Sequence, residues 1–205
     1  TRRALEFGSC SSVEPSDLNN RPGRQLCWLP HHTLTSCDRN RGEAIARAAE
    51  TVQKLCAERD VAFIINDSIA LAKRLGADGV HLGQDDGDPR EARDVLGRDA
   101  QIGVTCHNSR HFAMEAGEAS ADYVAFGAFY PTTTKEVQHQ ADPAILSWWT
   151  VVSPIPCVAI GGITAANAAP LVAAGADFIA VSGAVWNDPA GESAAVAALL
   201  KAIGH

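Results

Sequence analysis

The sequence predicts an α/β fold and, within that class, a (β/α)8 or TIM barrel. Three observations support this prediction. From residue 43 onwards, helix-like and strand-like segments alternate with short polar connections. The strand-like segments are continuous apolar runs, which are typical of parallel strands buried on both faces. A short motif recurs where helices lead into strands. Because alternation alone also fits a doubly wound sheet, that architecture remains the second choice.

The series opens with a helix over residues 43–59, in which Ile45, Ala48, Val52 and Leu55 fall on one face. A buried strand over residues 61–65 follows it. From there strands and helices alternate to the C-terminus. The predicted strands are 79–82, 102–105, 123–126, 157–160 and 178–181, and the predicted helices are 68–75, 89–96, 110–118, 143–151, 165–174 and 193–203.

The recurring motif has the form small-Ala-Asp-x-β-branched and occurs at residues 76–80, 120–124 and 175–179. Each copy stands at a junction between a predicted helix and the next predicted strand. The small residue ends the helix, and the Asp begins the turn before the strand. Copies of one junction indicate parallel strands joined by right-handed crossovers.

Residues 1–40 do not follow this pattern. A complete barrel needs two strands and a helix there, yet the stretch has no clear helical or strand period. Its only plausible strand seeds are residues 4–7 and 25–29. We therefore expect a single domain over residues 1–205 with an atypical N-terminal region.

Composition excludes several classes of protein. The chain of 205 residues has a formal net charge of −7, which argues against a nucleic-acid binder. It has no apolar run long enough to span a membrane, and its first residues do not resemble a secretory signal. The six cysteines form no CxxC pair, which is typical of a reduced, cytoplasmic protein. The cluster of Cys27, His31, His32 and Cys37 lacks the usual ligand spacing of a zinc site.

Carboxylates follow two consecutive predicted strands. Asn66 and Asp67 come after the first of these strands, and Asp85 and Asp86 come after the second. Since neighbouring parallel strands are about 4.8 Å apart, the carboxylates can converge on one cation. Oxygen ligands of this kind suit Mg²⁺, which also takes phosphate oxygens from a substrate. The alternative is that Asp67 caps a helix and the other two are solvated.

Later loops have the features of phosphate sites. The segment 132–135 combines three threonines with Lys135, the only lysine of this half outside a predicted helix. Gly161-Gly162 and Ser182-Gly183 follow two successive strands, where barrels often present backbone N–H groups to phosphate. Polar surface loops are the alternative. His81 lies within a predicted strand, where a packed histidine is the commoner case, and His107 has no evident orienting partner. Neither is assigned an acid–base role.

Taken in order, these motifs resemble the thiamine-phosphate synthase family. The resemblance covers about residues 43–205, and together the motifs are highly specific. The matching segments are Ile64-Ile65-Asn66-Asp67, residues 76–86, Gly103-Val104-Thr105-Cys106-His107, Pro131-Thr132-Thr133-Thr134-Lys135 and Ala159-Ile160-Gly161-Gly162-Ile163-Thr164. The family has a TIM-barrel fold and joins hydroxymethylpyrimidine diphosphate to hydroxyethylthiazole phosphate, giving thiamine phosphate and pyrophosphate.

The resemblance also implies roles for residues of this sequence. Asp67 and Asp86 correspond to ligands of Mg²⁺. Asn66 and Lys135 correspond to contacts with the leaving pyrophosphate, and Thr105 stands where the family often has Ser. The implied binding site for the thiazole phosphate consists of Thr132, Thr134, Gly162, Ser182 and Gly183. The implied partners are small phosphorylated substrates.

One departure from the family bears on activity. The family carries a Gln-Leu-Arg-x-Lys motif at the end of its second strand, in contact with the pyrophosphate. The nearest counterpart is Gln25-Leu26-Cys27, which lacks the basic residues and lies too far upstream of Asn66. A non-catalytic binder of phosphorylated ligands therefore stays open. So does a thiazole tautomerase, although Ala128 stands where that branch has a His and the Thr-Thr-Lys loop favours the synthase.

The oligomeric state cannot be read from the sequence. Three tryptophans, Trp148, Trp149 and Trp186, are candidates for an apolar contact surface in a homo-oligomer.

Overall fold

The computed structural model describes residues 25–29, 39–132 and 140–204. These residues fall into two compact units, which we describe separately. The N-terminal unit comprises residues 25–29 and 39–103, and the C-terminal unit comprises residues 104–132 and 140–204. The strand seed at residues 4–7 and three of the zinc candidates, His31, His32 and Cys37, lie outside the described residues.

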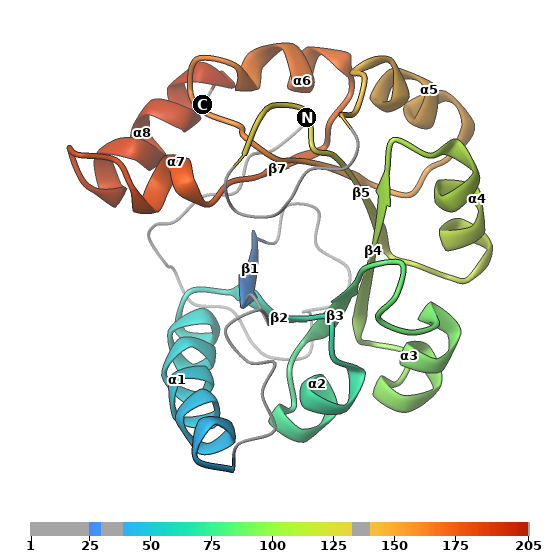
Figure 1. Ribbon diagram of the computed structural model, residues 1–205, viewed down its shortest axis with the longest axis vertical. Coiled ribbons are helices and arrows are strands. Elements are labelled where there is room, and N and C mark those ends of the chain that lie inside the picture. Colours follow the sequence, from blue (N-terminus) through green and yellow to red (C-terminus); the bar gives the residue numbers. More distant parts are fainter. Residues whose placement is uncertain (1–24, 30–38, 133–139, 205) are drawn as a thin grey trace. The chain divides into compact units, whose positions relative to one another are not determined.

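The N-terminal unit alternates strands and helices, as the sequence predicts. Its strands β1, β2 and β3 pair in parallel, with Leu29 opposite Ile65 and Asn66 opposite His81. Its helices lie along one side of these strands (Figure 1). The elements are β1 (Gln25–Leu29), α1 (Arg39–Glu58), β2 (Val61–Asn66), α2 (Ile69–Leu75), β3 (Gly79–Leu82), α3 (Pro89–Leu96) and the start of β4 (Gln101–His107).

The core of this unit forms around β2, whose residues are all buried. A strand buried on both faces is expected for a parallel sheet covered by helices. Side chains from α1, α2 and α3 complete the core on the helical side. The buried cluster contains Ala49, Cys56, Val61, Phe63, Ile65, Ala72, Val80, Leu82, Ala92 and Ile102.

The C-terminal unit continues the same alternation from the second part of β4. Strands β5, β6 and β7 pair in parallel, with Phe126 opposite Ala159 and Ile160 opposite Ala180. The elements that follow β4 are α4 (Arg110–Glu118), β5 (Tyr123–Phe126), α5 (Ala144–Val152), β6 (Cys157–Ile160), α6 (Ala168–Ala174), β7 (Phe178–Ala180), α7 (Gly183–Trp186) and α8 (Glu192–Ala202).

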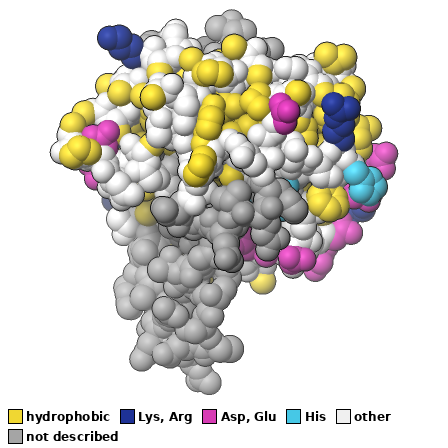
Figure 2. All heavy atoms as spheres, turned by 45° about the horizontal axis from the view of Figure 1, so that its top comes forward, with side chains coloured by type: hydrophobic (Ala, Val, Ile, Leu, Met, Phe, Trp, Pro, Cys, Tyr) yellow, Lys and Arg dark blue, Asp and Glu magenta, His cyan; other side chains and the backbone are white. Residues whose placement is uncertain are grey.

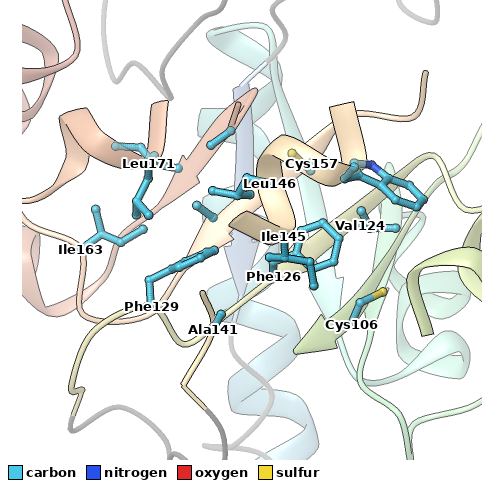
Figure 3. Close-up of a cluster of buried hydrophobic side chains, with 14 of the residues drawn as sticks. Cys106, Val124, Phe126, Phe129, Ala141, Ile145, Leu146, Cys157, Ile163 and Leu171 are labelled. Carbon is cyan, nitrogen blue, oxygen red and sulfur yellow. The ribbon is translucent and has the colours of Figure 1, made fainter. Parts of the chain in front are cut away.

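The core of the C-terminal unit lies between the strands and helices α4 to α6 and α8 (Figure 3). Trp149 is its largest fully buried side chain. The Trp149 ring meets Phe126 edge-on at 6.0 Å between centroids, and its indole N–H donates to the carbonyl of Ile155 at 2.8 Å. A buried indole therefore keeps both its apolar contacts and its hydrogen bond.

The recurring Asp forms the same hydrogen bonds at two of the junctions. Asp78 donates its N–H to the carbonyl of Phe63 at 3.0 Å, and its carboxylate accepts from the Phe63 N–H at 2.8 Å. Asp177 does the same with Cys157, at 3.1 and 2.9 Å. We call this pair of bonds the aspartate clamp. Each clamp lies one residue before the first ladder pair of its two strands, Ile64 with Gly79 and Val158 with Phe178.

The α/β class and the parallel pairing predicted from sequence are thus confirmed. The predicted bounds of β3, β5, β6, α3 and α4 agree with those of the structure. The prediction that α6 begins at Ala165 is wrong, because residues 165–167 form a turn that closes against the preceding loop. The four-residue helix α7 was not predicted, since so short a segment shows no period.

The tryptophans differ in their exposure. The sequence makes Trp149 a candidate for a contact surface. This prediction is wrong, because the Trp149 ring lies in the core. Trp148 is half-buried beneath the Arg110 guanidinium, which lies 5.0 Å from the ring centroid. Trp186 is 65% exposed, and Val151 at the end of α5 is 84% exposed. Figure 2 shows apolar side chains gathered on the face to which α5, α6 and α8 contribute. No helix of the described segments is both long and apolar enough to cross a membrane.

Asp177→Ala tests the aspartate clamp. Losing a hydrogen bond to a charged group should lower the free energy of unfolding by about 1.5–3 kcal/mol. Urea denaturation followed by circular dichroism measures this loss. Asp99→Ala, which removes an exposed carboxylate from the turn before β4, is the control and should change stability by less than about 0.5 kcal/mol. Equal effects of the two substitutions would show that the clamp adds no stability.

Candidate active-site loops

Two polar loops lie at the same edge of the N-terminal unit. Asn66 ends β2, and Gly83 follows the last residue of β3. Since Asn66 stands opposite His81 in the parallel ladder, the two loops leave the sheet at nearly the same level. The backbone N–H of Asp67 donates to the carbonyl of His81 at 2.8 Å and ties the first loop to β3.

The first loop holds Asn66 and Asp67 in a constrained arrangement. Asn66 is buried, and its side-chain N–H donates to a carboxylate oxygen of Asp67 at 2.5 Å. Asp67 adopts a left-handed backbone conformation with φ of 67°, which is uncommon for a residue other than glycine. The hydroxyl of Ser68, not the carboxylate of Asp67, caps α2 by accepting from the Leu71 N–H at 3.2 Å. The alternative reading of Asp67 as a helix cap is therefore wrong.

The second loop turns Asp86 back towards its strand. One carboxylate oxygen of Asp86 accepts from the N–H of Gly83 at 2.8 Å, and the side chain is half-buried. A Cβ at Gly83 would stand 2.5 Å from that oxygen, so only glycine leaves room for this contact. Asp85, by contrast, is exposed.

The donor set of these loops fits Mg²⁺. They offer the carboxylates of Asp67 and Asp86, each held by a neighbouring N–H. The described residues contain no cluster of three or more His, Cys, Asp or Glu side chains that could hold a metal. Mg²⁺ does not need such a cage, because it keeps several waters and is bound by one or two carboxylates with substrate phosphates.

The C-terminal unit presents a glycine loop after β6. Gly161 and Gly162 have φ of 98° and 64°, conformations that favour glycine. A Cβ at Gly162 would clash with the carbonyl oxygens of Tyr130 and Pro131. The Gly162 backbone therefore packs directly against the segment that leads from β5 into Thr132.

The other predicted residues of this unit lie at neighbouring strand ends. Thr132 is half-buried and follows Pro131, and Thr105 is half-buried within β4. Ser182 precedes α7, and Gly183 is the first residue of that helix. Within the described residues, no acceptor contacts the backbone N–H of Gly162 or Gly183. Thr134 and Lys135 lie outside the described residues.

The structure describes no activated nucleophile at these loops. Burial raises the pKa of the Cys106 thiol to about 12, so this thiol is protonated at neutral pH and not reactive. His81 is buried within β3, as the sequence reading of a packed histidine predicts. His107, at the end of β4, has a φ of 51° and its carbonyl accepts from the Gly127 N–H.

Gln25–Leu29, the nearest counterpart of the family's basic motif, lies in β1. The sequence argument that it is too far upstream of Asn66 is wrong, because α1 returns the chain and β1 pairs directly with β2. Cys27 and Leu29 stand where the motif has its Arg and Lys. Neither side chain carries a positive charge.

Comparison with protein families identifies the chain. The model of a family described as thiamine monophosphate synthase matches residues 37–185. The chain belongs to this family. A thiamine-phosphate synthase of Erythrobacter litoralis is 65% identical over 160 residues, covering 77% of this chain and 74% of the relative. One of Rhodospirillum centenum is 63% identical over 155 residues, covering 76% and 75%.

A solved structure of the same family agrees. The thiamine phosphate pyrophosphorylase of Pyrococcus furiosus superposes with a TM-score of 0.72 at 27% identity, covering 91% of this chain and 85% of that one. The resemblance inferred from the motifs is confirmed by both kinds of comparison.

Sequence reasoning missed two side chains that hold the glycine loop, Tyr130 and Asn167. The Asn167 side chain bonds the backbone of Gly162 and Thr164, and the Tyr130 hydroxyl donates to the Asn167 carbonyl. The sequence offers one signal for this contact, which is the polar residue Asn167 five positions after Gly162. It was read as part of α6 because its helical neighbours are apolar.

Gly83→Ala tests the arrangement of Asp86. The added methyl group should displace the carboxylate and raise the Mg²⁺ concentration for half-maximal activity about ten-fold, the effect of a 1.4 kcal/mol loss. A Mg²⁺ titration of the rate of thiamine phosphate formation measures it. Gly117→Ala is the control, since this helical glycine has room for a methyl group. A Mg²⁺ requirement unchanged in Gly83→Ala would contradict a role of Asp86 in binding Mg²⁺.

Proposed function

We propose that this chain is a thiamine-phosphate synthase, a transferase of thiamine biosynthesis. It joins hydroxymethylpyrimidine diphosphate and hydroxyethylthiazole phosphate, releasing pyrophosphate. The observation that carries the proposal is its membership of a family with relatives of that name at 65% and 63% identity. The polar loops at the strand ends support it, since they offer carboxylates in one unit and backbone N–H groups in the other.

The proposed reaction is a displacement at the pyrimidine methylene carbon. The thiazole nitrogen donates its electron pair and forms the new C–N bond, while the C–O bond to the diphosphate breaks and its electrons leave with pyrophosphate. The nitrogen is already nucleophilic, so attack needs no general base. The protein's task is to align the substrates and stabilise the leaving group. The absence of an activated nucleophile among the described residues of these loops is consistent with this chemistry.

The N-terminal loops are the proposed site of the leaving group. Asp67 and Asp86 would hold Mg²⁺, which when bound neutralises charge on the diphosphate. The Asn66 amide donates a hydrogen bond to the Asp67 carboxylate. We propose that Asn66 also contacts the diphosphate. Lys135 is proposed to contact the departing pyrophosphate. Thr105, which stands where the family often has Ser, is proposed as a further catalytic residue.

The C-terminal loops are the proposed site of the thiazole phosphate. Gly162 and Gly183 offer N–H groups without an acceptor among the described residues, and such groups bind phosphate at strand ends and helix starts. Ser182, Thr132 and Thr134 would add hydroxyl donors. This unit contains few cations: after Arg110, only Lys135 and Lys201 carry a permanent positive charge.

Further parts of the proposal concern the whole molecule. The two units belong to one domain over residues 1–205, which closes as an eight-stranded barrel. The chain acts on small phosphorylated substrates in the cytoplasm. A homo-oligomer remains a prediction, for which the exposed Val151 and Trp186 are the candidate contacts.

The decisive experiment incubates the protein with both substrates and Mg²⁺. We expect thiamine phosphate and pyrophosphate to form in equal amounts, measured by chromatography and a pyrophosphate assay. Thiazole phosphate bound without turnover would instead support the non-catalytic binder. Conversion of a thiazole tautomer without pyrophosphate release would support the tautomerase.

Restoring the missing basic residues should strengthen diphosphate binding. The double variant Cys27→Arg/Leu29→Lys adds the two cations of the family motif to β1, beside the strand that ends at Asn66. One charge-assisted hydrogen bond to phosphate should lower the Kd of the pyrimidine diphosphate about ten-fold or more. Isothermal titration calorimetry measures this. Cys27→Gln/Leu29→Gln is the uncharged control, and an equal gain in both variants would contradict the electrostatic argument.

A further inference from the structure

The Gly161–Thr164 loop is held by hydrogen bonds to its carbonyl groups. The backbone N–H of Tyr130 donates to the Gly161 carbonyl at 3.1 Å. The Asn167 side-chain N–H donates to the Gly162 carbonyl at 3.1 Å, and its side-chain oxygen accepts from the Thr164 N–H at 2.7 Å. One carboxamide therefore closes the loop on both sides.

Asn167 does not serve the helix that it precedes. It stands at the N-cap of α6, where an Asn side chain usually accepts from a backbone N–H of the first turn. Here it makes no such bond and reaches back to the loop instead. The Tyr130 hydroxyl donates to the Asn167 backbone carbonyl at 3.0 Å and holds the residue in place. The first turn of α6 therefore has no side-chain cap from Asn167, because that side chain bonds the loop.

The hydrogen bonds that hold the loop carbonyls also determine the direction of the loop N–H groups. In a trans peptide the C=O and the N–H point in opposite directions. The bond from Tyr130 to the Gly161 carbonyl therefore points the Gly162 N–H away from Tyr130. The bond from Asn167 to the Gly162 carbonyl likewise points the Ile163 N–H away from the Asn167 side chain. No acceptor among the described residues contacts either N–H group.

The far side of this peptide is anchored as well. The Ile163 side chain is buried and lies in the core cluster with Leu171 and Phe129 (Figure 3). A glycine at position 162 leaves the intervening peptide free to rotate, because glycine populates many backbone conformations. The Asn167 side chain is thus the group that selects one orientation of the Gly162–Ile163 peptide.

We propose that Asn167 is a positioning residue for phosphate binding: it orients the Ile163 N–H, beside that of Gly162, towards the phosphate of the thiazole substrate. This proposal rests on the proposed function for the identity of that ligand. Asn167 acts through the Gly162–Ile163 peptide and does not itself contact the phosphate. Its loss should weaken the binding of the thiazole phosphate and leave that of the pyrimidine diphosphate unchanged.

The test compares Asn167→Ala with Asn108→Ala. Asn108 is a matched control, since its side-chain oxygen also accepts from a backbone N–H, that of Asp142, but it does not contact the glycine loop. Calorimetry of both substrates with the full chain should show a Kd for thiazole phosphate raised about ten-fold or more in Asn167→Ala only. Steady-state kinetics should show the change in the KM for thiazole phosphate and little change in kcat.

A second variant separates positioning from folding. Asn167→Ser keeps a favoured N-cap residue for α6 and is too short to bridge to Gly162. It should fold like the parent chain by thermal denaturation and still bind thiazole phosphate about ten-fold more weakly. Unchanged thiazole phosphate affinity in Asn167→Ser, or equal weakening of both substrates, overturns the proposal. If the parent chain binds thiazole phosphate but forms no product, the proposed function fails while the binding comparison still tests Asn167.

Discussion

The aspartate clamp is the constraint on which both groups of loops depend. A shift of one residue between parallel strands would move every following loop to a different level and every side chain to the other face. In the N-terminal unit the clamp joins Asp78 to Phe63, and in the C-terminal unit it joins Asp177 to Cys157. The same register then places Asn66 opposite His81 and Ile160 opposite Ala180, at the ends from which the polar loops leave.

The clamp lies at the opposite end of the strands from the chemistry. Stabilising bonds at the amino ends leave the carboxyl ends free for residues in left-handed conformations, such as Asp67 and Gly162, whose φ values are 67° and 64°. This division is typical of folds built from parallel strands, in which sites form at the carboxyl ends. It is consistent with the Asp, Asn and Gly residues that stand in the family motifs after β2, β3 and β6.

Much of this arrangement is readable from the sequence because it depends on local patterns. Continuous apolar runs predict the buried strands, and the repeated Ala-Asp junction predicts their parallel order. The pairing of β1 with β2 was harder to predict, because it brings together residues such as Leu29 and Ile65 that are distant in the chain.

The details of the loops were less predictable. The role of Asn167 depends on a contact with Gly162 that no period reveals, and the apolar pattern of α6 hid the turn before it. The buried position of Trp149 likewise depends on the packing of Phe126 against it. The tryptophan's size gave no sign of which side of α5 faces the core.

In the proposed function, the two phosphorylated substrates are bound by different kinds of group. We propose that binding of the pyrimidine diphosphate depends on carboxylate-bound Mg²⁺ in the N-terminal unit. Binding of the thiazole phosphate is proposed to depend on backbone N–H groups in the C-terminal unit.

Calorimetric titration of each substrate, with Mg²⁺ and with an excess of chelator, tests this division most directly. We predict that the chelator weakens binding of the pyrimidine diphosphate about ten-fold or more while the Kd of the thiazole phosphate stays the same. An equal dependence of both substrates on Mg²⁺, or a dependence of neither, would contradict it.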